Sequence, residues 1–141
     1  MSIKLINLDF GLGVVFIGEG VVTGQDIINA NKIILSFEEK IKISKYCIID
    51  YSEASAYDVS KHEINIIADQ DKEISIYLPD YIVAIIAKRD LEFGVSRMWQ
   101  TIIEVNDLKW DTEIFRDRND AEKWIKNRAK EKYDIDLTFH L

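Results

Sequence analysis

The sequence has little of what marks secreted, fibrous or linker-rich proteins. It contains a single cysteine, Cys47, so no disulfide can form within the chain, and its one proline and six glycines leave no linker or low-complexity tract. No stretch approaches the roughly 20 apolar residues that a membrane span needs, and the first residues lack the apolar core of a signal peptide. We therefore expect a cytoplasmic protein with no membrane span.

The chain also lacks an excess of basic residues. Its formal net charge is −7, and the lysines and arginines of residues 120–131 alternate with acids. Nucleic-acid-binding proteins normally carry a basic patch or stripe, so we expect no nucleic acid partner. A length of 141 residues with 48% hydrophobic content suits one domain over residues 1–141.

Catalytic and metal-binding patterns are absent as well. The two histidines, His62 and His140, lie far apart, and Cys47 sits in an apolar run away from any base, so no nucleophile–base set is apparent. Residues 69–73 begin like a calcium loop but lack its later glycine and glutamate, and we expect them on the outer face of a helix. Residues 11–13 are too short for a dinucleotide fingerprint. We expect no enzyme, no metal and no cofactor.

What the chain does have is an unbroken apolar run over residues 82–87. A strand with no polar residue is buried on both faces, which is typical of a parallel or mixed sheet covered by helices. A polar turn and an amphipathic pattern follow, and they predict a helix from about residue 91. This segment indicates an α/β domain.

The remaining pattern predicts the order β-β-α-β-α-β-α-β-α, in a mixed sheet of five to six strands flanked by four α-helices. The expected strands are residues 3–9, 14–22, 46–50, 82–87 and 110–115, with residues 51–60 as a polar loop. Thr23 caps the first helix, which runs to about residue 40, and Asp58 or Ser60 caps the second, which stops at Pro79. The fourth helix follows residues 116–119.

Residues 134–141 form a C-terminal extension that we predict to hold an extra strand. Apolar and polar residues alternate along it from Ile135, which is typical of a half-buried strand. Such a strand can pair with a sheet edge of its own chain or of a partner subunit. The tail therefore offers a route to a homodimer.

Five segments in this order resemble the STAS/SpoIIAA-like domain, the fold of bacterial anti-sigma-factor antagonists, in a branch similar to lipid-binding Sec14 (CRAL-TRIO) domains. They are residues 18–23, 48–53, 83–87, 93–99 and 115–124. The resemblance implies a single SpoIIAA-like domain in which a serine after the central strand, at a helix start, is phosphorylated by a partner kinase. The matching stretch keeps the aspartate as Asp58, has Val59 at the phosphoacceptor position, and places Ser60 one residue on.

These residues define the candidate site. Ligands of open α/β sheets bind at the carboxyl ends of the strands, so Asp58, Ser60, Arg97 and Ser52 are expected to converge there. The structural alternative is that Asp58 and Ser60 cap a helix while Arg97 pairs with a nearby acid. The leading hypothesis is a non-enzymatic regulatory domain that presents residues 58–60 to a protein partner, with Ser60, Ser52 or Ser55 as phosphorylation sites.

A second hypothesis is a carrier of a small lipid-like or anionic ligand. Arg97 would meet the acidic head of the ligand, and an apolar cavity near Trp99 would hold the remainder. The three tryptophans are more typical of a hydrophobic core than of a ligand box.

Overall fold

A computed structural model describes residues 2–140 and arranges them around one five-stranded sheet. The strands lie side by side in chain order, and only the first pair is antiparallel. The strands are β1 (Ile3–Leu8), β2 (Gly13–Thr23), β3 (Tyr46–Asp58), β4 (Ile82–Ile86) and β5 (Asp111–Phe115). The predicted mixed α/β sheet is confirmed, with five strands.

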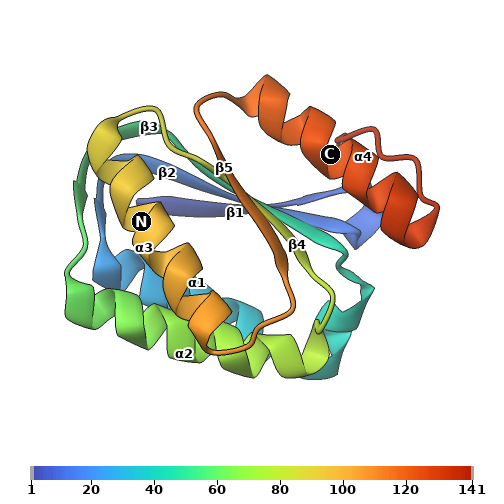
Figure 1. Cartoon of the computed structure of the whole chain (residues 1–141), viewed down its shortest axis with the longest axis horizontal. Helices are drawn as coiled ribbons and strands as arrows, with labels where there is room; N and C mark the ends of the chain where they lie inside the picture. Colours follow the sequence, from blue (N-terminus) through green and yellow to red (C-terminus); the bar gives the residue numbers. More distant parts are fainter. Residues whose placement is uncertain (1, 141) are drawn as a thin grey trace.

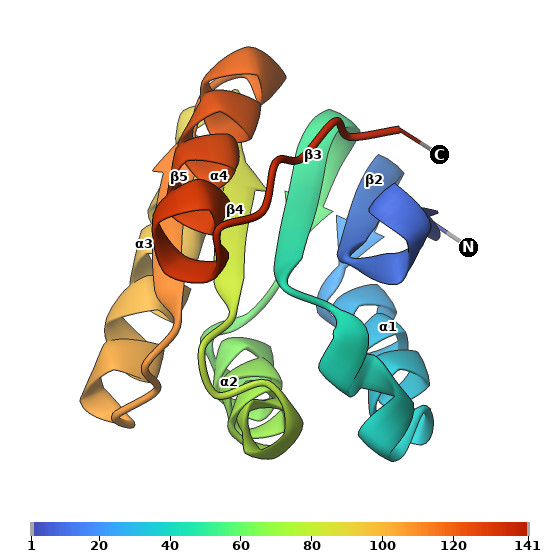
Figure 2. The same ribbon diagram turned by 90° about the vertical axis from the view of Figure 1, so that its right-hand side faces the viewer.

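Four helices cover the two faces of this sheet (Figure 1; Figure 2). Three of them, α1 (Gly24–Ser36), α2 (Lys61–Tyr77) and α3 (Asp90–Val105), cover one face, which we call the three-helix face. The fourth, α4 (Arg118–Tyr133), packs on the opposite face, which we call the α4 face. The predicted order of strands and helices is confirmed.

The helix starts follow from capping chemistry. Thr23 caps α1 as predicted, in a reciprocal capping box with Asp26. Of the two predicted candidates for the cap of α2, Asp58 and Ser60, the cap is Ser60, in a second capping box with Glu63. α1 is shorter than expected, because the chain leaves it at Ser36 and enters a 3₁₀ segment, η2 (Glu38–Ile43). The hairpin between β1 and β2 closes through a second 3₁₀ turn, η1 (Asp9–Gly11), in which Gly11 supplies a φ of +92°.

β3 extends further than predicted. Residues 51–58 were expected to form a polar loop, and this prediction is wrong, because they continue the strand and pair with the second half of β2. Two register shifts let the pair bend over this length. Tyr51 and Tyr57 face the core, while the residues between them are at least partly exposed, which gives this half of the strand its loop-like composition.

The predicted extra strand does not form in residues 134–140, and Leu141 lies outside the described residues. The tail instead crosses the α4 face toward η1 (Figure 2). Leu137 is 2% exposed and packs in the core there, while the Asp9 carboxylate accepts hydrogen bonds from Thr138 and Phe139. The apolar residue of the tail is thus buried within its own chain and not at a sheet edge.

Among the helices within residues 2–140, none combines the length and the apolar composition that crossing a membrane requires.

Candidate functional site

Asp58 and Ser60 lie where two helices begin. Asp58 ends β3 and is paired with Thr23, the cap of α1. Ser60 caps α2: its hydroxyl accepts a hydrogen bond from the Glu63 N–H at 3.1 Å, and Glu63 Oε1 accepts one from the Ser60 N–H at 2.9 Å. The Glu63 side chain also fills the space where a Cβ on Gly24 would lie. The first turns of α1 and α2 are therefore neighbours.

We call the surface formed by Thr23, Gly24, Asp58 and Ser60 the helix-start patch. Asp58 and Ser60 are exposed in it. The two helix starts contribute partial positive charge, which favours acidic side chains and anions. Hydrogen bonds donated by Ser2 and Thr23 hold the pKa of Asp26 below its usual value, so this carboxylate stays charged beside the patch.

Ser52 and Arg97 are not part of this patch. Ser52 precedes Asp58 by six residues in β3, which corresponds to about 20 Å along a strand. Arg97 lies on the exposed side of α3, where its guanidinium carbon is 6.0 Å from the centre of the Phe93 ring. Within residues 2–140, no hydrogen bond or ion pair joins Arg97 to Ser52, Asp58 or Ser60. The expected convergence of all four residues does not occur.

Three guanidinium–carboxylate pairs instead occupy the carboxyl ends of the parallel strands, and the sequence analysis did not identify them. They are Arg118 with Asp50 at 3.2 Å, Arg116 with Asp90 at 3.1 Å, and Arg89 with the buried Glu92. Arg116 also lies over the Phe93 ring at 4.2 Å. These arginines are already paired, so they fix the strand ends and the start of α3. Their position directly after β4 and β5 was the signal that could have revealed them.

A buried polar bridge links the three helices of the three-helix face. The Asp71 carboxylate on α2 accepts hydrogen bonds from Trp99 Nε1 on α3 at 2.7 Å and from Asn31 Nδ2 on α1 at 3.4 Å. Burial raises the pKa of Asp71 to about 7, against the opposing effect of these two hydrogen bonds. We expected residues 69–73 on the outer face of a helix, and for Asp71, which is 6% exposed, that expectation is wrong.

A cavity of about 40 Å³ lies beside this bridge, lined by residues that include Trp99, Tyr51 and Asp71. A cavity needs about 10–15 Å³ to hold one water molecule, so this space suits a few waters and not a lipid. Trp99 is 5% exposed and belongs to the core, as its pattern predicted.

Nucleophilic or metal chemistry would depend on the cysteine and on the possible metal ligands among residues 2–140. Burial raises the pKa of the Cys47 thiol, which keeps it protonated in the core. Within residues 2–140, the acids, histidines and cysteine form no cluster of three or more that could ligate a metal.

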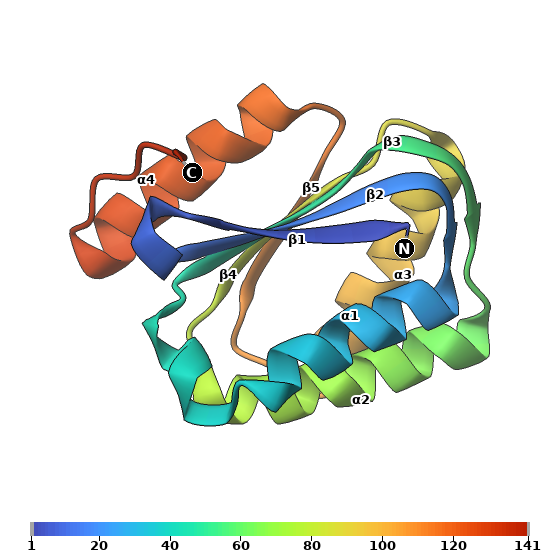
Figure 3. The same ribbon diagram turned by 180° about the vertical axis from the view of Figure 1, so that it is seen from behind.

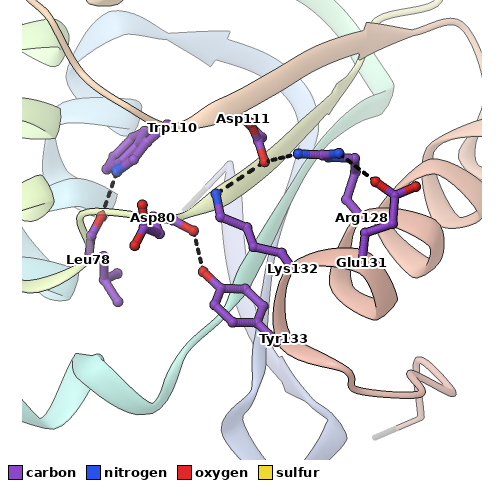
Figure 4. Close-up of polar contacts among 8 residues, drawn as sticks. All are labelled: Leu78, Asp80, Trp110, Asp111, Arg128, Glu131, Lys132 and Tyr133. Carbon is purple, nitrogen blue, oxygen red and sulfur yellow. Dashed lines mark hydrogen bonds and ion pairs between the residues drawn. The ribbon is translucent and has the colours of Figure 1, made fainter.

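At the amino ends of the parallel strands, polar contacts anchor α4 to the rest of the chain (Figure 4). The Asp111 carboxylate accepts hydrogen bonds from Arg128 at 2.8 Å and Lys132 at 3.1 Å. The Tyr133 hydroxyl donates to the Asp80 carbonyl, and Trp110 Nε1 donates to the Leu78 carbonyl. Because Asp111, Arg128, Lys132 and the Tyr133 hydroxyl are already paired within the chain, we assign this cluster a structural role.

Comparison with known proteins identifies a fold. No protein-family model matches the chain, and no curated protein does. The chain is similar to the solved structure of an uncharacterised protein from the DUF3478 family, with a SpoIIAA-like fold, from Shewanella loihica PV-4. The TM-score is 0.50 and the identity 19%, over 87% of this chain and 91% of that chain. At this identity the likeness shows the fold alone: as its sequence resemblance predicted, this chain has a SpoIIAA-like fold.

Proposed function

We propose that the chain is a non-enzymatic regulatory domain of the cytoplasm that binds a protein partner through the helix-start patch. The exposed Ser60 hydroxyl at the start of α2, beside exposed Asp58 and the start of α1, carries this proposal. The resemblance to anti-sigma-factor antagonists supports it, since those proteins use a helix start after the central strand to control partner binding. The arginines at the carboxyl ends support it too, since they are paired with acids of the same chain, whereas Asp58 and Ser60 are exposed to a partner.

Phosphorylation of Ser60 would switch this interaction. A phosphate adds about −1.5 to −2 charge, which a helix start tolerates because its N–H groups and dipole favour anions. Asp58 and Glu63 already place negative charge beside Ser60. The modified patch would therefore repel an acidic partner without unfolding α2.

The test compares Ser60→Asp with Asn65→Asp, which adds the same charge on the exposed side of α2. Aspartate caps helices about as well as serine, so Ser60→Asp keeps the fold. Each protein is used to capture partners from its own cells, and recovery is measured by quantitative mass spectrometry. We expect the wild type and Asn65→Asp to recover the same partner in similar amounts. Ser60→Asp should recover at least tenfold less of it. Equal recovery with all three proteins would contradict the proposal.

The alternative, a ligand carrier centred on Arg97 and Trp99, gains no support from the geometry. The cavity beside Trp99 measures about 40 Å³, whereas sites for small molecules usually measure about 300–1,000 Å³. Arg97 lies on the exposed side of α3 and does not line this cavity.

A further inference from the structure

A larger hollow lies elsewhere on the three-helix face. A groove of about 440 Å³ runs between strands β1 and β2 and the segment that leads from the end of α1 through η2. Figure 3 shows these elements on one side of the molecule, with β1 above α1. Leu5 and Val14 contribute from the strands, and Ile34, Phe37 and Ile43 from the opposite wall. The volume falls within the range of about 300–1,000 Å³ that is typical of small-molecule sites.

The walls of this groove are apolar and open to solvent. Nine of the thirteen residues that line it have aliphatic or aromatic side chains. Three of these remain substantially exposed: Ile33 at 36%, Phe37 at 47% and Ile43 at 55%. Ile33 lies in the last turn of α1, Phe37 directly follows that helix, and Ile43 ends η2. Exposed apolar side chains gathered at one hollow mark a binding site, in contrast to scattered ones.

Positive charge lies at the same place, in a chain whose net charge is −7. Lys40 is the charged residue that lines the groove, and it is exposed. A smaller hollow of about 130 Å³ adjoins the groove through Ser44, Leu78 and Tyr81, and both Lys42 and Lys45 line it, together with Asp80. Lys42 pairs with Glu39 at 3.4 Å, and Lys45 lies over the Tyr133 ring at 5.1 Å. No ion pair joins Lys40 to another of residues 2–140, so its charge is available to a ligand.

We propose that this groove binds a single-chain amphiphile with an anionic head, namely a long-chain carboxylate. Its alkyl chain lies against Leu5, Val14 and Phe37, and its carboxylate meets Lys40. Among residues 2–140, Lys40 is the one charged residue on this largely apolar wall, and it selects such a ligand over a neutral or cationic one, because the two charges complement each other. This site is separate from the helix-start patch, so the two proposals can fail independently.

The first test measures how affinity depends on chain length. Octanoate, decanoate and dodecanoate are titrated calorimetrically, below their micelle concentrations, into the full chain after it has been stripped of lipid. Each buried methylene contributes about 0.8 kcal/mol, so we expect affinity to rise about fourfold per methylene, or about fifteenfold for each added pair. Affinity that does not change with chain length would overturn the proposal, as would the absence of binding.

The second test concerns the head group. Dodecanoate should bind at least tenfold more tightly than dodecanol, and Lys40→Gln should remove this difference without changing the affinity for dodecanol. Lys40 is exposed, so this substitution leaves the fold intact. Equal binding of dodecanoate and dodecanol by the wild type would overturn the assignment of an anionic ligand.

The third test locates the site and distinguishes a ligand from a second copy of the chain. Ile43→Glu places a carboxylate on the groove wall, and Val105→Glu makes the same change at an exposed residue on α3. We expect Ile43→Glu to lower the affinity for dodecanoate at least tenfold, while Val105→Glu and Ser60→Asp bind it as tightly as the wild type does. Equal binding by Ile43→Glu overturns the location. A doubled native mass that Ile43→Glu abolishes, without dodecanoate binding, assigns the groove to a second copy and overturns the ligand.

Discussion

The two faces of the sheet are packed in different ways. The three-helix face holds a buried carboxylate, Asp71, with small cavities around it and an open apolar groove at one side. The α4 face buries Ile125 completely, and the tail covers the part of the sheet that lies beside η1. The comparison teaches that the α4 face serves stability, while both proposed binding surfaces belong to the three-helix side.

The two faces also differ in the buried carboxylate that each contains, Asp9 on the α4 face and Asp71 on the three-helix face. On the α4 face, the Asp9 carboxylate accepts hydrogen bonds from the Tyr46 hydroxyl at 2.7 Å and from the Thr138 hydroxyl at 2.9 Å. Gly13 allows this arrangement, because the Tyr46 ring occupies the space where a Cβ would lie. These hydrogen bonds hold the pKa of Asp9 below its usual value, although burial alone would raise it. On the three-helix face, burial outweighs the hydrogen bonds to Asp71.

The largest effect is expected from Ile125→Ala, which breaks the packing of the α4 face. Ile125 is 0% exposed, and truncating a fully buried isoleucine removes apolar contacts and leaves a cavity. We expect the free energy of unfolding to fall by about 3–4 kcal/mol in urea titrations. Ile76→Ala, at a residue that is 76% exposed on α2, is the control and should change it by less than about 0.5 kcal/mol. Equal effects of the two substitutions would show that α4 is not packed as described.

The second-largest effect is a dependence of stability on pH, which arises from Asp71 in the core of the three-helix face. The pKa of Asp71 is about 7 in the folded chain, against an ordinary value of 3.8, so the folded state binds this proton more tightly. The resulting stability is complete below pH 3.8 and is lost as the pH rises through 7. We expect a loss of about 2–3 kcal/mol between about pH 5 and pH 8, measured by denaturant titration.

The matched variants for this prediction are Asp71→Asn and Asp69→Asn. Asp71→Asn should remove this contribution to the pH dependence, whereas Asp69→Asn, at an exposed neighbour on α2, should retain it. An identical pH profile for wild type and Asp71→Asn would mean that Asp71 is ionised in the folded core.

A smaller effect is expected from Asp9→Ala, which frees the tail. The substitution leaves the Tyr46 and Thr138 hydroxyls without their acceptor, so we expect a loss of about 2 kcal/mol. Residues 134–140 should also become more susceptible to proteolysis. Asp136→Ala changes an exposed acid within the tail and serves as the control. Unchanged proteolysis after Asp9→Ala would show that other contacts hold the tail.

The smallest effect concerns the cap of α2 in the helix-start patch. Ser60→Ala removes the side-chain acceptor for the Glu63 N–H and should lower stability by about 1 kcal/mol. Ser60→Asp should leave stability within about 0.5 kcal/mol of wild type, because aspartate can accept the same bond. Thermal unfolding measures both. A large loss of stability in Ser60→Asp would remove its value as a mimic of phosphorylation.

The order of strands and helices was predictable because apolar periodicity and caps are local properties of the sequence. The second half of β3 was not, since its serines and acids are typical of loops and only pairing with β2 makes it a strand. The tail gave the reverse error, because its strand-like alternation predicted a strand that does not form. Leu137 is instead buried in a core that residues from other segments build.

The candidate site likewise has residues that local sequence predicts and residues that only the tertiary structure places. The cap of α2 follows from a few consecutive residues: Asp58 or Ser60 was predicted, and the cap is Ser60. Arg97 and Ser52 were placed beside it by assuming that strand ends coincide, which the length of β3 prevents. Asp71 depends on Asn31, which is 40 residues away, and on Trp99, which is 28 away, so no local pattern could mark it as buried.

Amide hydrogen exchange on the complex captured from cells, compared with the free chain, tests the division between the two faces most directly. It reports which segments a bound partner covers. The account predicts slower exchange in the first turns of α1 and α2, from residues 24–28 and 61–65, with the exchange of α4 unchanged. Slower exchange in α4 and the tail, with the starts of α1 and α2 unchanged, would contradict it and place the partner on the α4 face.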